Sequence, residues 1–261
     1  MLDIVPNHMA ATVENPWWQD VLRHGRNSSY AAYFDIDWEP ARPGLANKVL
    51  LPILGEPFGK VLENQQLTLR LAEDGFWVWY YEKRLPLNPS SSLRVLAGWA
   101  QTLARDGGAV DPALSQLLAL LASLTASPPP GAAGRQSTAW QQGWKSLWQL
   151  YNTQPAVKAF IDRNLRKLNG SKGDPQSFNR LEHILAEQAY RLAFWRVAKE
   201  EINYRRFFDV SDLVAIRMED KNVFQAVHAL VFKLVEAGQV TGLRIDHIDG
   251  LYDPQEYLNR L

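Results

Sequence analysis

The sequence has no cysteine among its 261 residues, which excludes disulfide bonds and thiolate metal ligands. It also has no charge bias, because 28 Lys and Arg side chains balance 28 Asp and Glu side chains. A chain without net charge offers no overall attraction to nucleic acid or to an anionic membrane, so neither is expected as a partner.

Long apolar runs are missing as well. The longest leucine-rich run, residues 114–124, is too short to span a bilayer. Residues 1–11 have no basic segment ahead of the apolar one and include Asp3 and His8, which is atypical of a signal peptide. We therefore expect a cytoplasmic protein, whose oligomeric state the sequence does not predict.

Aromatic residues are plentiful, and ten of them are tryptophans. Trp140, Trp144 and Trp148 recur every four residues and therefore share one face of a predicted helix. A tryptophan stripe of this kind packs against other helices or offers flat surfaces to sugar rings, and helix packing is the favoured interpretation.

Apolar periodicity predicts most of the regular elements. Strands are expected over residues 2–5 and 240–245, and a hairpin over 66–81 with its turn at Asp74-Gly75. In the hairpin, both faces carry aromatic side chains, so both are expected to be covered. The predicted helices span residues 93–105, 112–124, 174–201 and 222–237.

Two segments are expected to lack regular structure. Residues 14–60 are rich in Pro, Gly, Asn and Trp, which is typical of an ordered loop region. The segment SPPPGAAG, residues 127–134, is expected to interrupt the helical region.

The two predicted strands, 2–5 and 240–245, are nearly continuous in apolar residues, and each ends in polar residues. Such strands are typical of a parallel sheet that is covered on both faces. Because a simple β/α/β crossover needs only about 30 residues, the long stretch between these strands is interpreted as an insertion into a parallel sheet or barrel.

The second strand ends in the sequence GLRIDHIDG, in which Arg244 and Asp246 share one face. A guanidinium beside a carboxylate favours the ionised carboxylate, and such a group at the mouth of a barrel can act as a glycosidic nucleophile. The alternative is an ion pair that only holds the loop.

The first strand delivers Asn7 and His8 in the sequence DIVPNH, and Asp3 lies within the strand. His8 could donate a hydrogen bond to a substrate hydroxyl group. The alternative is a structural turn, because Pro6-Asn7 is favourable turn chemistry.

Together and in this order, DIVPNH and GLRIDHIDG resemble the first and second signature regions of the α-amylase superfamily of glycoside hydrolases. Further segments extend the likeness to the maltooligosyltrehalose synthase family, the glucosylmutase branch of that superfamily. These segments are YFDIDW, KVLLPILGEPFGKVL, EQAYRLAFWR and INYRRFFDVSDL. The resemblance covers essentially the whole chain and is least typical over residues 105–140.

This resemblance implies an α/β fold, namely a partial (β/α)8 TIM barrel that contributes strands three and four, with a large, mainly helical insertion containing a small β-hairpin region. The implied division is residues 1–10 for strand three and its loop, 11–89 for an irregular and β insertion, 90–205 for a helical insertion, and 206–261 for the return to the barrel.

The resemblance also implies roles for individual residues. Asp246 matches the catalytic nucleophile and Arg244 the residue that holds it. The residues matched to substrate binding are Asn7, His8, His247 and Asp249, and Asp3 matches a mainly structural carboxylate.

The implied reaction converts the reducing-end α-1,4 bond of a maltooligosaccharide into an α,α-1,1 bond by a retaining double displacement. No metal and no cofactor is expected. A closed, aromatic-rich pocket would trap the freed glucose and exclude water. The tryptophan-rich insertion and NYRRFFD are candidates for its wall, although RRFF is equally typical of a packing corner.

A retaining mechanism needs a second carboxyl group as acid and base. In the family this is a Glu downstream of GLYDP, and the third family carboxylate also lies further along. We therefore expect an internal fragment that is inactive alone. Glu256 follows the motif in a predicted helix and is not assigned as the acid.

Two other functions remain open at this stage. One is an α-amylase-type hydrolase of α-1,4-glucans, because the two signature regions alone do not exclude it. The other is a non-catalytic carbohydrate-binding protein that has kept the barrel shell.

Overall fold

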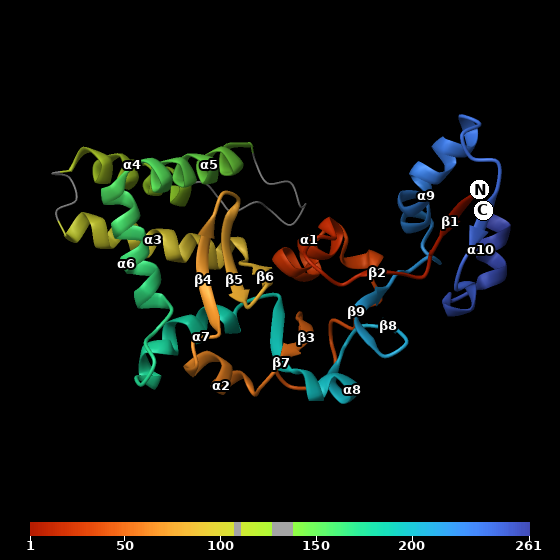
Figure 1. Cartoon of the computed structure of the whole chain (residues 1–261), viewed down its shortest axis with the longest axis horizontal. Coiled ribbons are helices and arrows are strands. Elements are labelled where there is room, and N and C mark those ends of the chain that lie inside the picture. Colours follow the sequence, from red (N-terminus) through yellow and green to blue (C-terminus); the bar gives the residue numbers. More distant parts are fainter. Residues whose placement is uncertain (107–110, 127–137) are drawn as a thin grey trace.

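A computed structural model describes residues 1–106, 111–126 and 138–261. It has a mixed α/β architecture with ten α-helices and four small sheets among the described residues. The predicted break at residues 127–134 lies outside the described residues. Figure 1 shows a helical region at one end, a central region around two strands, and a smaller region at the other end that contains both termini.

The helices are α1 (Pro16–His24), α2 (Phe58–Glu63), α3 (Pro89–Arg105), α4 (Pro112–Ala126), α5 (Thr138–Thr153), α6 (Pro155–Leu168), α7 (Asn179–Ala186), α8 (Ala198–Glu201), α9 (Lys221–Glu236) and α10 (Pro254–Arg260). The strands are β1 (Leu2–Ile4), β2 (His8–Ala10), β3 (Val49–Leu54), β4 (Leu67–Ala72), β5 (Gly75–Tyr80), β6 (Lys83–Pro86), β7 (Tyr190–Phe194), β8 (Arg206–Phe207), β9 (Val210–Ala215) and β10 (Leu243–Ile245). Within the described residues, no helix is both long and apolar enough to cross a membrane.

The two ends of the chain meet in a parallel pair of strands, β1 and β10, as the sequence predicts (Figure 1). Asp3 lies opposite Arg244 in this pair. The expectation that both strands are buried is wrong, because their apolar residues are only half-buried and Asp3 and Arg244 are exposed. Two strands alone cannot cover both of their faces.

A three-stranded antiparallel sheet, in the order β2-β9-β8, links this end to the centre of the molecule. Its strand β2 follows β1 directly, and its strand β9 leads into α9. Strand pairing therefore connects the residues that follow β1 to β9, the strand that precedes α9 and β10.

The central region contains a second parallel pair, β3 and β7, which the sequence analysis missed. The expectation of little regular structure over residues 14–60 is therefore wrong: α1, β3 and α2 lie there. The pair is buried, because Val49, Leu50 and Leu54 are fully covered. Proline-rich composition concealed a buried strand, since β3 itself includes a proline.

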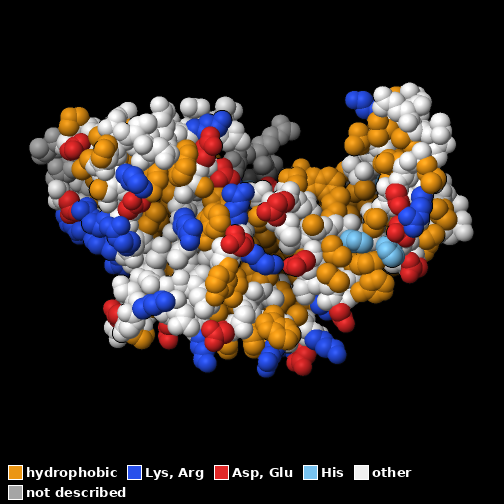
Figure 2. Space-filling view, in the orientation of Figure 1, with side chains coloured by type: hydrophobic (Ala, Val, Ile, Leu, Met, Phe, Trp, Pro, Cys, Tyr) orange, Lys and Arg blue, Asp and Glu red, His pale blue; other side chains and the backbone are white. Residues whose placement is uncertain are grey.

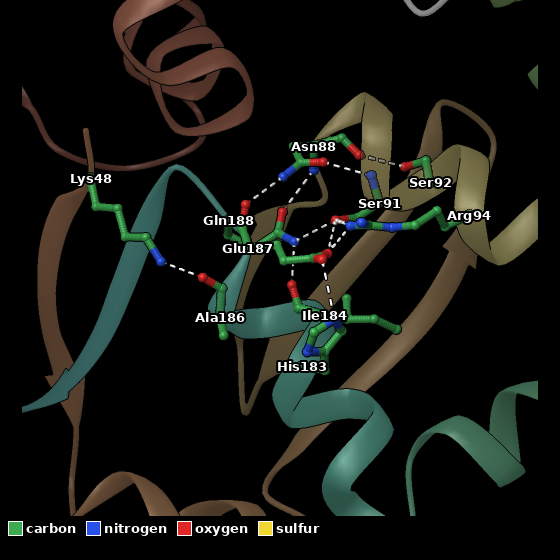
Figure 3. Close-up of polar contacts among 10 residues, drawn as sticks. All are labelled: Lys48, Asn88, Ser91, Ser92, Arg94, His183, Ile184, Ala186, Glu187 and Gln188. Atoms are coloured by element: carbon green, nitrogen blue, oxygen red, sulfur yellow. Dashed lines mark hydrogen bonds and ion pairs between the residues drawn. The ribbon is translucent and has the colours of Figure 1, made fainter. Parts of the chain in front are cut away.

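The predicted helix over residues 174–201 is also wrong, because α7 ends at Ala186 and β7 begins at Tyr190. Figure 3 shows the side-chain contacts at the end of α7. Glu187 forms ion pairs with Arg94 and with His183, and Gln188 accepts a hydrogen bond from the Asn88 backbone at 2.8 Å. These contacts satisfy the end of α7 and the start of α3 together, and the chain then pairs with β3.

The predicted hairpin is confirmed, but its turn lies one residue earlier than predicted. β4 and β5 pair antiparallel around the two-residue turn Glu73-Asp74, with Gly75 already in β5, and β6 adds a third strand. Phe76 and Trp77, on opposite faces of β5, are both 1% exposed, so both faces are covered at this point. Tyr81 follows the strand in a left-handed conformation and is exposed.

The tryptophan stripe of α5 packs as core, which confirms the favoured interpretation. Trp140 and Trp144 are buried, and Trp144 meets Phe76 of the hairpin edge to face at 5.3 Å between ring centroids. The predicted helices over 93–105 and 112–124 correspond to α3 and α4.

A separate, smaller core joins α9 and α10. The helix predicted over 222–237 corresponds to α9, and Asp220 caps it by accepting hydrogen bonds from the first backbone N–H groups. Gly238 follows in a left-handed conformation, as is usual after a helix.

Candidate active site

Asp246 directly follows strand β10, and its backbone N–H donates to the carbonyl of Ile4 at 2.9 Å. The parallel pairing therefore brings the ends of the two predicted strands to one place. Arg244 donates to the Asp3 carboxylate at 2.5 Å and lies 3.8 Å from the Asp246 carboxylate. A single guanidinium thus faces both carboxylates.

These charged groups are half-exposed: the side-chain exposures are 53% for Asp3, 58% for Arg244 and 37% for Asp246. The described residues therefore present a half-exposed surface at this place, and the expected closed pocket stays a prediction. The tryptophans of α5 do not contribute to this surface, because α5 lies at the opposite end of the molecule from β1 (Figure 1).

Asn7 is 3% exposed, and its side chain forms hydrogen bonds to other residues of the chain. Its Nδ2 donates to the carbonyl of His247 at 3.0 Å, and its Oδ1 lies 2.5 Å from Nδ1 of His8. Asn7 therefore ties the end of the first strand to the turn after the second and orients the His8 ring.

The rings of His8 and His247 lie 6.5 Å apart between centroids. Burial and the neighbouring charge of His247 lower the pKa of His8. A neutral imidazole at this place can accept or donate a hydrogen bond at neutral pH. His247 has a left-handed backbone, with φ 55° and ψ 41°, which is an uncommon conformation for a residue other than glycine.

Aromatic side chains continue this surface. Phe207 stacks on His8 at 4.1 Å and meets His247 edge to face at 4.8 Å. Phe208 is 73% exposed at the tip of the β8–β9 hairpin. Figure 2 shows histidine side chains beside hydrophobic ones, with acidic and basic groups close by.

In the RRFF segment, Phe207 contacts His8 and His247, whereas Arg206 bonds within its own hairpin to Asp209 and Ser211. The contribution of this segment to a site wall stays a prediction. Sequence reasoning did not single out Arg205, which donates to the carbonyl of Gly250 at 3.0 Å.

The last predicted position, Asp249, and the unassigned Glu256 lie further along the chain. Asp249 is exposed within the short 3-10 turn at Ile248–Gly250. Glu256 lies on α10 and forms an ion pair with Arg260 at 2.7 Å.

A carboxylate at the end of a parallel strand, beside a guanidinium, imidazoles and exposed aromatic rings, is an arrangement suited to enzymes that act on carbohydrates. Comparison with known proteins narrows this class. The chain is similar over its whole length to maltooligosyltrehalose synthases, as the motifs predict.

A protein assigned as a maltooligosyl trehalose synthase in Mycobacterium tuberculosis H37Rv is 29% identical over 263 residues, which cover 100% of this chain and 21% of that protein. Among solved structures, maltooligosyltrehalose synthase from Arthrobacter ramosus is 28% identical with a TM-score of 0.56, covering 99% of this chain and 22% of that one. The DSM5389 glycosyltrehalose synthase is 27% identical with a TM-score of 0.56, covering 99% and 24%.

No family model matches the chain. The chain spans about a fifth of the length of the curated relatives it matches. The resemblance to maltooligosyltrehalose synthase is nevertheless confirmed along all of it.

Proposed function

We propose that this chain carries the nucleophile half of a glucosylmutase active site. The reaction moves the reducing-end glucose of a maltooligosaccharide from an α-1,4 to an α,α-1,1 bond. The observation that carries the proposal is the meeting of Asp246, Arg244, Asn7 and His8 at one end of the β1–β10 pair, in a chain similar throughout to synthases of that name.

In the proposed mechanism, the Asp246 carboxylate attacks the anomeric carbon while the C1–O4 bond breaks, which gives a β-linked glycosyl-enzyme. Arg244 faces this carboxylate and orients it. The freed glucose then turns, and its anomeric hydroxyl oxygen attacks C1 while Asp246 leaves as a carboxylate. Two inversions give net retention.

A second carboxyl group must protonate O4 and later take the proton of the attacking hydroxyl, from about 5 Å away from the nucleophile. We propose that this group lies in a longer polypeptide, in keeping with relatives about five times as long. The likeness to these relatives also supports two further proposals, the partial (β/α)8 barrel and the four-part division of the chain. A cytoplasmic location stays a prediction.

His8, His247 and Asp249 are proposed to contact the sugar at and beside the bond that is cleaved. His8 and His247 lie close together, and Phe207 packs against both of their rings. Exposed aromatic rings next to hydrogen-bonding groups suit the apolar faces and hydroxyl edges of a glucose ring.

The test uses the full-length gene product with maltopentaose as substrate. Isomerisation removes reducing ends without releasing glucose. Replacement of the nucleophile, Asp246→Asn, is expected to lower the rate by about 10³-fold or more, because the covalent step is lost. Loss of reducing ends and the amount of non-reducing product measure this directly.

The matched control is Glu256→Gln, which removes a carboxylate that pairs with Arg260 on α10. Its activity is expected to stay within about twofold of the wild type, as for most surface changes. Full activity of Asp246→Asn would contradict the nucleophile assignment.

The same assay separates the two other candidate functions. A hydrolase of α-1,4-glucans raises the number of reducing ends, whereas a non-catalytic carbohydrate-binding protein leaves them unchanged. The charged groups kept at the end of β10 favour a catalytic function over the binding one.

A further inference from the structure

The Arg205 side chain lies where three separate segments meet. Its Nε donates to the Asp35 carboxylate at 2.8 Å, one Nη to the carbonyl of Gly250 at 3.0 Å, and the other Nη to the carbonyl of Ile216 at 3.5 Å. These partners belong to the loop after Phe34, to the turn after Asp246 and to the segment directly after β9. The planar fork of a guanidinium suits such divided contacts.

The turn that Arg205 holds is under conformational constraint. His247 has a left-handed backbone, and such residues persist only where surrounding contacts fix them. The carbonyl of His247 accepts from Asn7 Nδ2 and from the N–H of Gly250 at 3.2 Å. A Cβ on Gly250 would collide with the Asn7 side chain, so the turn is closely packed on this side.

The two attachments of the turn are joined through Ile216, the residue directly after β9. Asn7 fixes His247, and the Asn7 carbonyl accepts from the N–H of Ile216 at 3.0 Å. The Ile216 carbonyl faces Arg205, which fixes Gly250. This closed chain of hydrogen bonds connects the turn after Asp246 to the inserted region.

We propose that Arg205 is a positioning residue that makes the site transfer the enzyme-bound glycosyl group to the freed glucose instead of to water. This inference rests on the proposed function. By holding the turn that carries His247, Arg205 keeps the sugar-facing groups in place while the glycosyl-enzyme waits. A loosened turn releases the freed glucose, and the oxygen of a water molecule then forms the new bond to C1 as Asp246 leaves.

The proton balance is the same for both outcomes. In each case the attacking hydroxyl gives its proton to the carboxylate that earlier protonated O4, and the Asp246–C1 bond breaks. Only the attacking oxygen differs, so the ratio of the two products reports how well the turn holds the sugar.

The experiment compares Arg205→Lys with Arg206→Lys in the full-length gene product on maltopentaose. Lysine keeps the charge beside Asp35 but loses the fork that reaches Gly250 and Ile216. We expect the ratio of released glucose to non-reducing product to rise on the order of tenfold in Arg205→Lys. Arg206 bonds only within its hairpin among the described residues, so its variant is expected to keep the wild-type ratio.

A role in folding alone would lower both products in proportion and leave their ratio unchanged, which would overturn the proposal. Asp35→Asn is a second variant that leaves Arg205 in place and weakens one of its contacts. It is expected to shift the ratio in the same direction by a smaller factor.

Hydrogen exchange of peptides covering residues 246–252 gives a readout that does not depend on activity. Exchange there is expected to be faster in Arg205→Lys, with peptides of α9 unchanged as the internal reference. Faster exchange with an unchanged product ratio would overturn the positioning role. If the wild type forms no non-reducing product, the proposed function fails, and unchanged exchange would then overturn the hold on the turn as well.

Discussion

At the residue scale, the Arg244 guanidinium faces two carboxylates, those of Asp3 and Asp246. With side chains more than half exposed, the Asp3–Arg244 pair contributes only about 0–1 kcal/mol to folding. Its effect is geometric, because Asp3 fixes one side of the guanidinium and leaves the other side toward Asp246. We propose that the structural role that the resemblance implies for Asp3 acts through this orientation of Arg244.

His228 has a different kind of constraint, since it is 1% exposed in the small core of α9 and α10. Its Nδ1 donates to the carbonyl of Phe224 at 2.8 Å, and its Nε2 accepts from the Tyr257 hydroxyl at 2.8 Å. Burial lowers the pKa of His228 below its usual 6.5. The neutral ring is therefore the form that the fold contains.

This arrangement predicts a loss of stability in acid. As pH falls below 6.5, the unfolded chain binds a proton at this histidine and the folded chain resists it, so the free energy of unfolding decreases. Thermal unfolding of the full-length gene product at pH 7.5 and pH 5.5 measures the effect. His228→Gln is expected to lower stability at pH 7.5 by about 1–3 kcal/mol and to reduce the pH dependence. An identical pH dependence in both proteins would contradict the assignment.

At the element scale, the packing of α4 against α5 decides whether a glycine of α5 can be replaced by alanine without loss of stability. Gly143 lies in the middle of α5, where glycine costs about 1 kcal/mol relative to alanine. A Cβ at Gly143 would collide with the buried Leu124 of α4. Gly98 of α3 is also within a helix, but its Cβ would meet nothing within 4 Å. Gly143 therefore allows the close approach of α4 and α5, whereas the space around Gly98 would admit a larger side chain.

Alanine variants at these two positions separate the effect of helix propensity from the effect of packing. Gly98→Ala is expected to stabilise the protein by about 0.5–1 kcal/mol, because the helix gains and nothing is displaced. Gly143→Ala is expected to destabilise it by about 1–2 kcal/mol, because overpacking outweighs the helical gain. Denaturant unfolding of both variants measures the difference. Equal stabilisation by the two changes would show that Leu124 moves aside at no cost.

Local sequence patterns predicted the elements whose surroundings agree with their periodicity. The hairpin, α3, α4 and α9 were found in this way, because one apolar face or a tight turn specifies each. The helix expected over residues 174–201 was wrong, because the α7–β7 boundary depends on Asn88 and Arg94, about a hundred residues away. No window of sequence around Glu187 contains these partners.

At the scale of the whole molecule, the β1–β10 pair is the least complete part. Two parallel strands leave two edges unpaired and their apolar residues half-exposed, although parallel sheets are normally buried on both faces. The site at the end of this pair therefore lies on strands that are only partly covered by the described residues.

We expect the purified 261-residue chain alone to be inactive on maltopentaose. The open strand edges leave Asp246 without a rigid support, and the reaction needs the second carboxyl group described above. Reducing ends should stay constant, while the full-length gene product under the same conditions removes them. Turnover by the short chain at a comparable rate would contradict this dependence.

The sequence by itself determined the identity of the chemical groups and the resemblance to maltooligosyltrehalose synthase. DIVPNH and GLRIDHIDG each place polar residues after a short apolar strand, which is a local pattern. Only the tertiary structure decided that Asn7 and Arg205 hold the turn after Asp246, and that Phe207 packs against both His8 and His247. The physical reason is distance along the chain: contacts between residues 45 to 240 positions apart depend on how whole elements pack, which no local pattern encodes.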